Sequence, residues 1–401
     1  MRAAWRWFGP NDPVTLDDIR QVGADEIVTA LHELPAGVVW TAEAVAARKR
    51  MIETTPEGLK PLKWTVVESI PVHDDIKRGA PGYERYIETW IASLEALAAN
   101  DIRVVCYNFM PVLDWTRSDL GWKLPTGARA LRFDADEIAA FDIFILRRPG
   151  AEAAWDQDAR ARAAAVHAAM SDSDRKRLTD TIIAGLPGNM TGAHTLDGFR
   201  DALARYVGID RNALRQNIIH FLEAVVPHAE RLGMKLAIHP DDPPRDLFGL
   251  PRSASVAADF DAIFKAVPSP ANGITFCVGS LGARPDNDVP AMARAFAGRI
   301  HFAHLRDTAR DPVNPNSFYE AEHLHGTTDM VAVVDALLAE ERRRAREGGE
   351  AIPFRPDHGH QMLDDLGKTV NPGYSAIGRM KGLAEIRGIE AALKYHASRT
   401  G

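Results

Sequence analysis

Four apolar stretches in the second half of the chain decide the fold. They are M-K-L-A-I-H-P (234–240), G-I-T-F-C-V-G (273–279), I-H-F-A-H-L-R (300–306) and I-P-F-R-P-D-H (352–358). Each is short and rich in branched or aromatic residues, as buried strands are. Helical patterns separate them, and alternation of strands with helices predicts a parallel sheet.

The first half of the chain shows the same alternation. Strands are expected at 2–8, 25–31, 62–69 and 101–108, and helices after Thr15 and at 42–54, 82–99, 211–232, 255–267, 288–298, 327–347 and 375–398. Thr15 and Thr41 are expected N-caps, because their hydroxyls can accept from free N–H groups of the first turn. Eight strand–helix units predict an α/β fold of the TIM type, a closed (β/α)8 barrel formed by residues 1–401 as one domain.

Residues 109–210 interrupt this rhythm. The segment is rich in Ala, Asp and Arg, and helices are expected at 136–146, 151–169, 173–184 and 197–206. It follows the fourth strand, so it emerges at the barrel face where such folds carry their active sites. We expect a helical insertion, of which part of 115–210 forms a lid or an oligomer contact.

Composition narrows the classes of function. The 401 residues are 46% hydrophobic and 26% charged, which is typical of a globular protein. The net charge of -7 does not favour nucleic acid as a partner. Neither an apolar run of the ~18 residues that a membrane helix needs nor a secretory signal is found. Two cysteines provide no disulfide framework, so we expect a cytoplasmic protein that contacts no membrane.

Four potential metal ligands stand at the ends of the four quoted strands. His239, Cys277, His304 and Asp357 offer two imidazoles, a thiolate and a carboxylate. Taken singly, each is more simply a core or capping residue. Neighbouring barrel strands would bring all four to one mouth, where four buried polar groups need a shared partner. The pattern therefore predicts a metal site.

Two residues beside these ligands carry further chemistry. Arg306 could hold a substrate carboxylate through two hydrogen bonds, and a structural salt bridge is an equal alternative. His358 could act as a general acid or base near neutral pH, or simply support the ligands. The strand ends carry no glycine-rich phosphate motif, so a nucleotide cofactor is not expected.

Nine segments together resemble the D-mannonate dehydratase family. They are W-R-W-F-G-P-N-D-P-V (5–14), A-L-H-E-L-P-A-G-V-V-W (30–40), V-V-E-S-I-P-V-H-D-D-I-K (66–77), V-C-Y-N-F-M-P-V-L-D-W-T-R (105–117), I-H-P-D-D-P-P (238–244), F-C-V-G-S-L-G-A (276–283), I-H-F-A-H-L-R (300–306), R-P-D-H-G-H (355–360) and N-P-G-Y-S-A-I-G-R (371–379). They follow one another along nearly the whole chain. The resemblance is weakest over 118–210.

The resemblance implies a xylose-isomerase-like barrel that removes water from D-mannonate to give 2-dehydro-3-deoxy-D-gluconate, a step of hexuronate (glucuronate) catabolism. It implies a divalent ion, usually Mn²⁺, on the same four ligands. A thiolate ligand favours softer ions, so Fe²⁺, Co²⁺ and Zn²⁺ stay open. It also implies that His358 and Tyr374 divide the acid and base roles. We favour Tyr374 as the base that removes the C2 proton and His358 as the acid at C3, although the sequence leaves the opposite order open.

Residues at or just after the early strand ends are candidate contacts for sugar hydroxyls. They are Arg6, His32, Glu68, Asn108 and Trp115. Each is equally consistent with a structural role.

Three other functions fit parts of the pattern. A sugar isomerase or epimerase on the same barrel would share the metal but act on aldoses. A barrel nuclease would need a metal cluster and a basic face. A non-catalytic sugar-acid-binding protein would need neither metal nor Tyr374. We also expect a homo-oligomer, a dimer or larger.

Overall fold

Eight parallel strands of the computed structural model close into a barrel, in the order β1, β12, β9, β8, β7, β4, β3, β2. The structure describes residues 1–185 and 195–400. The barrel strands are β1 (Arg2–Arg6), β2 (Glu26–Thr29), β3 (Lys63–Glu68), β4 (Val104–Tyr107), β7 (Lys235–Ile238), β8 (Asn272–Cys277), β9 (Ile300–His304) and β12 (Pro353–Arg355). Each expected strand overlaps an observed one, which confirms the predicted α/β barrel.

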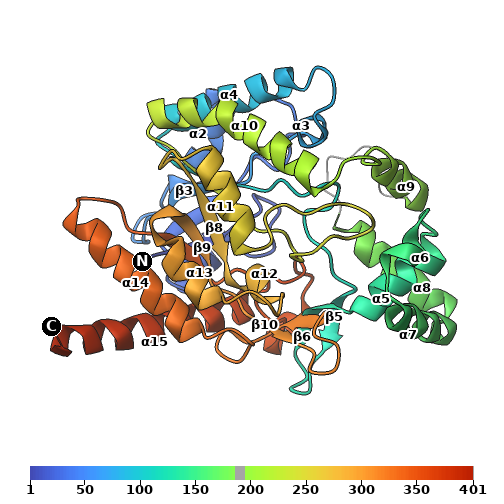
Figure 1. The fold of residues 1–401 in the computed structure, drawn as a ribbon. Helices are drawn as coiled ribbons and strands as arrows, with labels where there is room; N and C mark the ends of the chain where they lie inside the picture. Colours follow the sequence, from blue (N-terminus) through green and yellow to red (C-terminus); the bar gives the residue numbers. More distant parts are fainter. Residues whose placement is uncertain (186–194, 401) are drawn as a thin grey trace.

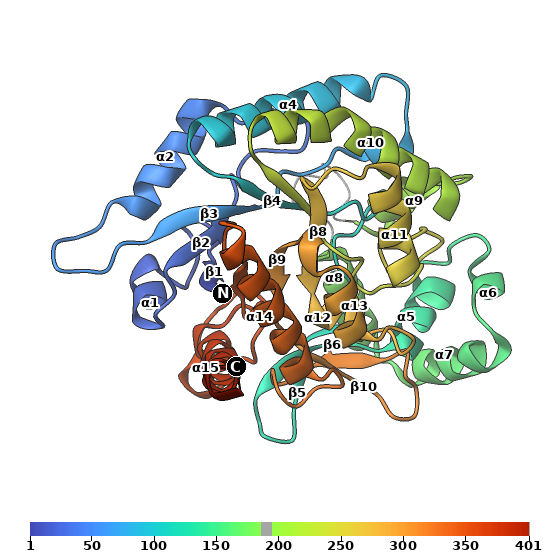
Figure 2. The ribbon, with the colours of Figure 1, turned by 60° about the vertical axis from the view of Figure 1, so that its left-hand side comes forward.

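Helices surround the barrel (Figures 1 and 2). They are α1 (Leu16–Gln21), α2 (Ala42–Glu53), α3 (Asp74–Arg78), α4 (Glu84–Ala99), α10 (Arg211–Arg231), α11 (Ala257–Ala266), α12 (Val278–Gly282), α13 (Val289–Ala295), the 3-10 turns η2 (Ala297–Arg299) and η3 (Leu363–Gly367), α14 (Met330–Arg346) and α15 (Ala376–Thr400). Both expected caps are present, because Thr15 accepts from the N–H of Asp18 and Thr41 from that of Ala44. None of the helices within 1–185 and 195–400 has the length and apolarity of a membrane span.

Successive side chains along each barrel strand point alternately into the barrel and toward the helices, which gives two apolar layers. Ala4, Val28, Val66 and Phe302 pack with one another in one cluster. Trp5 and other residues next to them in sequence belong to the large cluster that includes the surrounding helices. A barrel filled by side chains leaves its mouth as the place for a site.

The insertion lies to one side of the barrel (Figure 1). It contains β5 (Asp119–Lys123), β6 (Arg129–Phe133), α5 (Ala135–Ala140), the π-helical segment η1 (Phe141–Ile145), α6 (Ala151–Ala154), α7 (Gln157–Ala169), α8 (Asp172–Ile183) and α9 (Leu196–Ala204). The single helix expected over 151–169 is wrong, since Asp156 caps a new helix by accepting from the N–H of Ala159 at 2.8 Å. The expected helix at 136–146 continues from α5 as η1.

The sequence did not predict a second sheet. Strands β5 and β6 join β10 (Thr308–Arg310) and β11 (Phe318–Glu320) in the antiparallel order β10, β11, β6, β5. Its outer strand β5 is half-exposed and lacks the regular alternation that identifies a strand. This sheet connects the insertion to the segment that follows β9, and it brings residues of both to the barrel mouth.

Candidate metal centre and active site

Three of the four expected ligands lie together. Strand pairing places Cys277 beside His304, and His239 follows the end of β7. One ligand atom from each lies within 4.8 Å of the others. Cys277 and His304 are fully buried, and His239 is partly exposed. Imidazole and thiolate groups in this arrangement can coordinate a divalent cation.

The two imidazoles are oriented for such a role. Nδ1 of His239 lies 2.7 Å from the carbonyl oxygen of Pro240, which fixes a proton there and leaves Nε2 available. Nδ1 of His304 is buried without a hydrogen-bond partner among the described residues. A buried polar atom without a partner is costly, and a bound cation would remove that cost. The residues present therefore fit a metal ion.

Asp357, the fourth expected ligand, adjoins this group but is held by arginines. Its Oδ2 lies 3.7 Å from Nδ1 of His304 and 3.8 Å from Sγ of Cys277. Nε of Arg306 donates to the same oxygen at 2.6 Å, and Arg355 donates to Oδ1. Burial raises the pKa of Asp357, but Arg355, the neighbouring histidines and Arg306 outweigh it and hold that pKa well below its usual range. The carboxylate is thus charged and next to the three ligands.

Arg306 lies at the site, yet its hydrogen bonds favour the salt-bridge alternative. Besides Asp357, it donates through Nη1 to both oxygens of Glu320 and through Nη2 to Asp242 and Ser280. These five hydrogen bonds match the five N–H groups of a guanidinium. The expected role as substrate-carboxylate anchor is therefore not supported, because no donor is free.

The two expected acid–base residues share one cavity of about 320 Å³, which His239 and Asp357 also line. The rings of His358 and Tyr374 meet edge to face with centroids 4.9 Å apart. Nδ1 of His358 lies 3.1 Å from Oε1 of Glu320, and Nε2 lies 3.7 Å from Oδ1 of Asp357. Burial raises the pKa of Tyr374.

Four of the five expected sugar contacts line this cavity: Arg6, Glu68, Asn108 and Trp115. His32 does not, and it lines an adjoining cavity of about 680 Å³. The carboxylate of Glu68 is already occupied, because it accepts from Arg355 at 2.8 and 3.0 Å and pairs with Arg6 at 2.7 Å. Its Oε2 lies 3.5 Å from Nε2 of His304, where it can orient that ring.

The family model D-mannonate dehydratase (UxuA) matches residues 1–400. The chain belongs to the D-mannonate dehydratase family. Members of this family are hydro-lyases, so the chain is assigned to that class of enzyme.

Individual relatives are similar to this chain over nearly their full lengths. Mannonate dehydratase of Brucella melitensis is 56% identical over 393 residues, covering 98% of this chain and 97% of the relative. That of Chromohalobacter salexigens is 56% identical over 397 residues, covering 99% and 100%. The crystal structure of mannonate dehydratase from Streptococcus suis is 33% identical and superposes with a TM-score of 0.76, covering 99% of this chain and 96% of that one.

Residues that sequence reasoning did not identify complete the mouth of this D-mannonate dehydratase barrel. Arg117 is fully buried and donates to both oxygens of Asp242, at 2.7 and 3.1 Å, and to Glu320 at 2.6 Å. Glu320 comes from the second sheet, which had no signal in the sequence. Asp242 stands in the segment 238–244 quoted above, but no role follows from the sequence. Its oxygens accept from Arg117 and Arg306, which gives it a structural role rather than that of a metal ligand.

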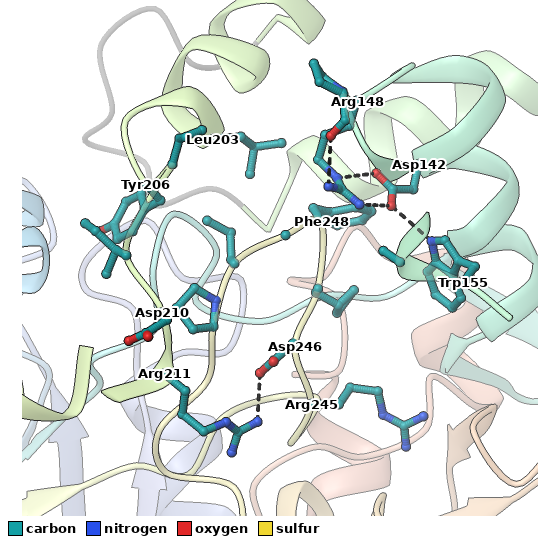
Figure 3. Close-up of a pocket in the computed structure, with 18 of the residues that line it drawn as sticks. Asp142, Arg148, Trp155, Leu203, Tyr206, Asp210, Arg211, Arg245, Asp246 and Phe248 are labelled. Atoms are coloured by element: carbon teal, nitrogen blue, oxygen red, sulfur yellow. Dashed lines mark hydrogen bonds and ion pairs between the residues drawn. The ribbon is translucent and has the colours of Figure 1, made fainter. Parts of the chain in front are cut away.

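A larger cavity of about 1120 Å³ lies between the insertion and the loop at 245–251 (Figure 3). It contains none of the expected site residues. Much of its charge is paired internally, since Arg148 and Trp155 donate to Asp142 and Arg211 donates to Asp246. The candidate ligands and the expected acid–base residues therefore identify the cavity of about 320 Å³ as the candidate active site.

Proposed function

We propose that this chain is a metal-dependent hydro-lyase that converts D-mannonate to 2-dehydro-3-deoxy-D-gluconate and water. One observation carries the proposal: the ligand atoms of His239, Cys277 and His304 lie within 4.8 Å of one another, and His239 lines the cavity shared by His358 and Tyr374. Membership of the D-mannonate dehydratase family supports the same substrate.

The metal would be held by His239, Cys277, His304 and Asp357. When bound, a divalent cation supplies electrostatic stabilisation of the negative charge that develops next to the substrate carboxylate. Mn²⁺ is the ion we propose, with Fe²⁺, Co²⁺ and Zn²⁺ as alternatives because the thiolate favours softer ions. Glu68 then acts by orienting His304.

The proton transfers are assigned to the two cavity residues. Tyr374 acts as the base in its phenolate form, so its phenol must lose a proton before the reaction; burial opposes that loss and Arg355 favours it. The phenolate oxygen then accepts the C2 proton, and Nε2 of His358 donates a proton to the hydroxyl that leaves C3 as water. The C2–H and C3–O bonds break, a C2=C3 enol forms, and the enol tautomerises to the 2-keto acid. The carboxylate of Glu320, 3.1 Å from Nδ1, supports this order because it can accept a hydrogen bond from that nitrogen and so orient the ring.

The experiment is an assay of the purified, chelator-stripped protein with D-mannonate, before and after adding each of the four ions. Product detected by NMR as a 2-keto-3-deoxy acid, and only after metal returns, is the expected result. Absence of product with every ion would overturn the proposal. Turnover of an aldose instead would support the isomerase, and binding without turnover would support the sugar-acid-binding protein.

We place this reaction in hexuronate catabolism in the cytoplasm, where the two free thiols of Cys106 and Cys277 are stable. We further propose that the chain forms one domain whose insertion is a lid or an oligomer contact in a dimer or larger assembly. Trp115 on the catalytic cavity and α9 on the adjoining one support the lid. Deletion of 150–190 that leaves both turnover and oligomeric state unchanged would overturn it.

A further inference from the structure

Asp114 stands where two cavities meet. The catalytic cavity and the adjoining cavity of about 680 Å³ share the lining residues Arg6, Glu68, Ser69, Asn108 and Asp114. His239, Asp357, His358 and Tyr374 line the first of these cavities, and none of the proposed ligands or acid–base residues lines the second. The main-chain N–H of Asp114 donates to the carbonyl of Gly185 at 3.3 Å, which ties the start of the insertion to the residues that follow α8. Asp114 therefore lies on the part of the catalytic wall that opens into the adjoining cavity.

The carboxyl group of Asp114 makes few interactions with the described residues of the protein. Burial raises its pKa, and the amide of Asn108 donates a hydrogen bond to it. Lys77 and Arg252 act on it at longer range, and no ion pair found among the described residues includes it. Glu68 on the same wall is saturated by arginines. Asp114 thus keeps acceptor capacity for a ligand.

His32 adds a neutral donor and acceptor nearby. Burial, together with Arg6 and Arg48, lowers its pKa to about 3, so its ring is uncharged at neutral pH. Both ring nitrogens are buried without a hydrogen-bond partner among the described residues. The cation at the junction, Arg6, is already paired with Glu68. Lys77 and Arg205 line the adjoining cavity but not the catalytic one. At the junction itself, a carboxylate, an amide and a neutral imidazole suit hydroxyl groups.

The rest of the catalytic wall is mixed. Phe8, Met110, Leu131 and Pro372 present apolar groups there, while Trp115 and Asn371 carry polar groups. A hexonate that has its reacting carbons at the metal site and its tail toward the adjoining cavity would place its last hydroxyls at the junction.

We propose that Asp114, with Asn108 and His32, forms a subsite that binds the C5 and C6 hydroxyls of a hexonate substrate and thereby selects its chain length. This subsite rests on the proposed dehydration of D-mannonate. It extends that proposal by naming the group that distinguishes a hexonate from shorter sugar acids.

The test compares two substrates in two variants. L-Erythronate has the configuration of D-mannonate at C2 and C3 but lacks C5 and C6. Asp114→Asn keeps the size of the side chain and removes its charge, and Asp201→Asn is the matched control, since Asp201 is an exposed residue on the adjoining cavity alone. All proteins are assayed with metal restored. The short acid is measured as a substrate or, where its turnover is below detection, as a competitive inhibitor.

We expect Asp114→Asn to lower kcat/KM for D-mannonate by ~10- to 100-fold, the usual effect of losing a hydrogen bond to a charged group, mostly through KM. In Asp114→Asn, kcat/KM or the inhibition constant for L-erythronate should change by less than ~3-fold, because this acid lacks the hydroxyls that contact Asp114. Asp201→Asn should change the constants of neither acid, because Asp201 makes no contact with them. An equal loss for both acids, or no loss for D-mannonate, would overturn the subsite. Failure of the unaltered protein to dehydrate D-mannonate would instead overturn the proposed function.

Discussion

Replacing Arg117 with methionine probes the buried charge network that joins the insertion to the barrel mouth. The side chain of Arg117 is inaccessible to solvent and bonds to Asp242 and Glu320. Methionine keeps the apolar stem, so packing against Phe318, whose ring lies 5.0 Å from the guanidinium carbon, is largely retained. The variant then leaves two buried carboxylates with only Arg306 as a shared arginine partner.

The size of the effect follows from the burial. Removing one partner of a buried ion pair costs about 3–5 kcal/mol, because the other partner stays desolvated. At about 2.1 cal/mol/K per residue, unfolding of a chain of 401 residues has an entropy of about 0.8 kcal/mol/K. The melting temperature should therefore fall by about 4–6 °C. Turnover should also fall, because Glu320 contacts His358.

The assay is differential scanning calorimetry at one scan rate, with Arg177→Met as the control. Arg177 pairs with Asp119 at 3.5 Å and is 44% exposed, so its loss should cost less than about 1 kcal/mol. A melting temperature of Arg117→Met within 1 °C of the unaltered protein, or equal to that of Arg177→Met, would refute the reasoning, because the network would then contribute nothing to stability.

The remaining predictions concern the proton transfers and the pH dependence of stability. Tyr374→Phe and His358→Asn should each lower kcat by ~10²- to 10⁴-fold, measured by NMR, while the metal content stays unchanged by elemental analysis. Retention of kcat in either variant would remove that residue from the mechanism. Burial lowers the pKa of His301 to about 3, so the folded protein resists a proton that the unfolded chain accepts below about pH 6.5. Stability contributed by keeping His301 neutral is therefore complete above pH 6.5 and is lost as the pH falls toward 3, by up to ~1.4 kcal/mol per pH unit. His301→Gln should flatten the melting temperature between pH 6.5 and 4, and an unchanged slope would contradict this.

The barrel was predictable because its signal is local and repeated. Each strand is a short apolar run between helical patterns, and the closure of eight parallel units follows from their number. The grouping of the candidate ligands was predictable for the same reason, since the last residues of neighbouring parallel strands share one edge. His239, Cys277 and His304 come together because β7, β8 and β9 are neighbours in the barrel.

What was missed depends on contacts between distant segments. Glu320 reaches the site because β11 pairs with β6 from the insertion. These strands are short and irregular, so the sequence does not predict their pairing. The bonding of Arg306 could not be read from its position either. A strand-end arginine beside a metal site suits a substrate carboxylate equally well, until Asp242, Glu320 and Asp357 are found around it.

The central claim is that Cys277 is a ligand of a divalent ion at the barrel mouth. Its most direct test is the absorption spectrum of the chelator-stripped protein reconstituted with Co²⁺, in which a coordinated thiolate produces a thiolate-to-cobalt charge-transfer band. Cys106→Ser is the matched control, because Cys106 is equally buried but is not among the candidate ligands. We predict the band in the unaltered protein and in Cys106→Ser, and its absence in Cys277→Ser. A band that persists in Cys277→Ser, or that is absent from the unaltered protein at stoichiometric Co²⁺, would contradict the claim.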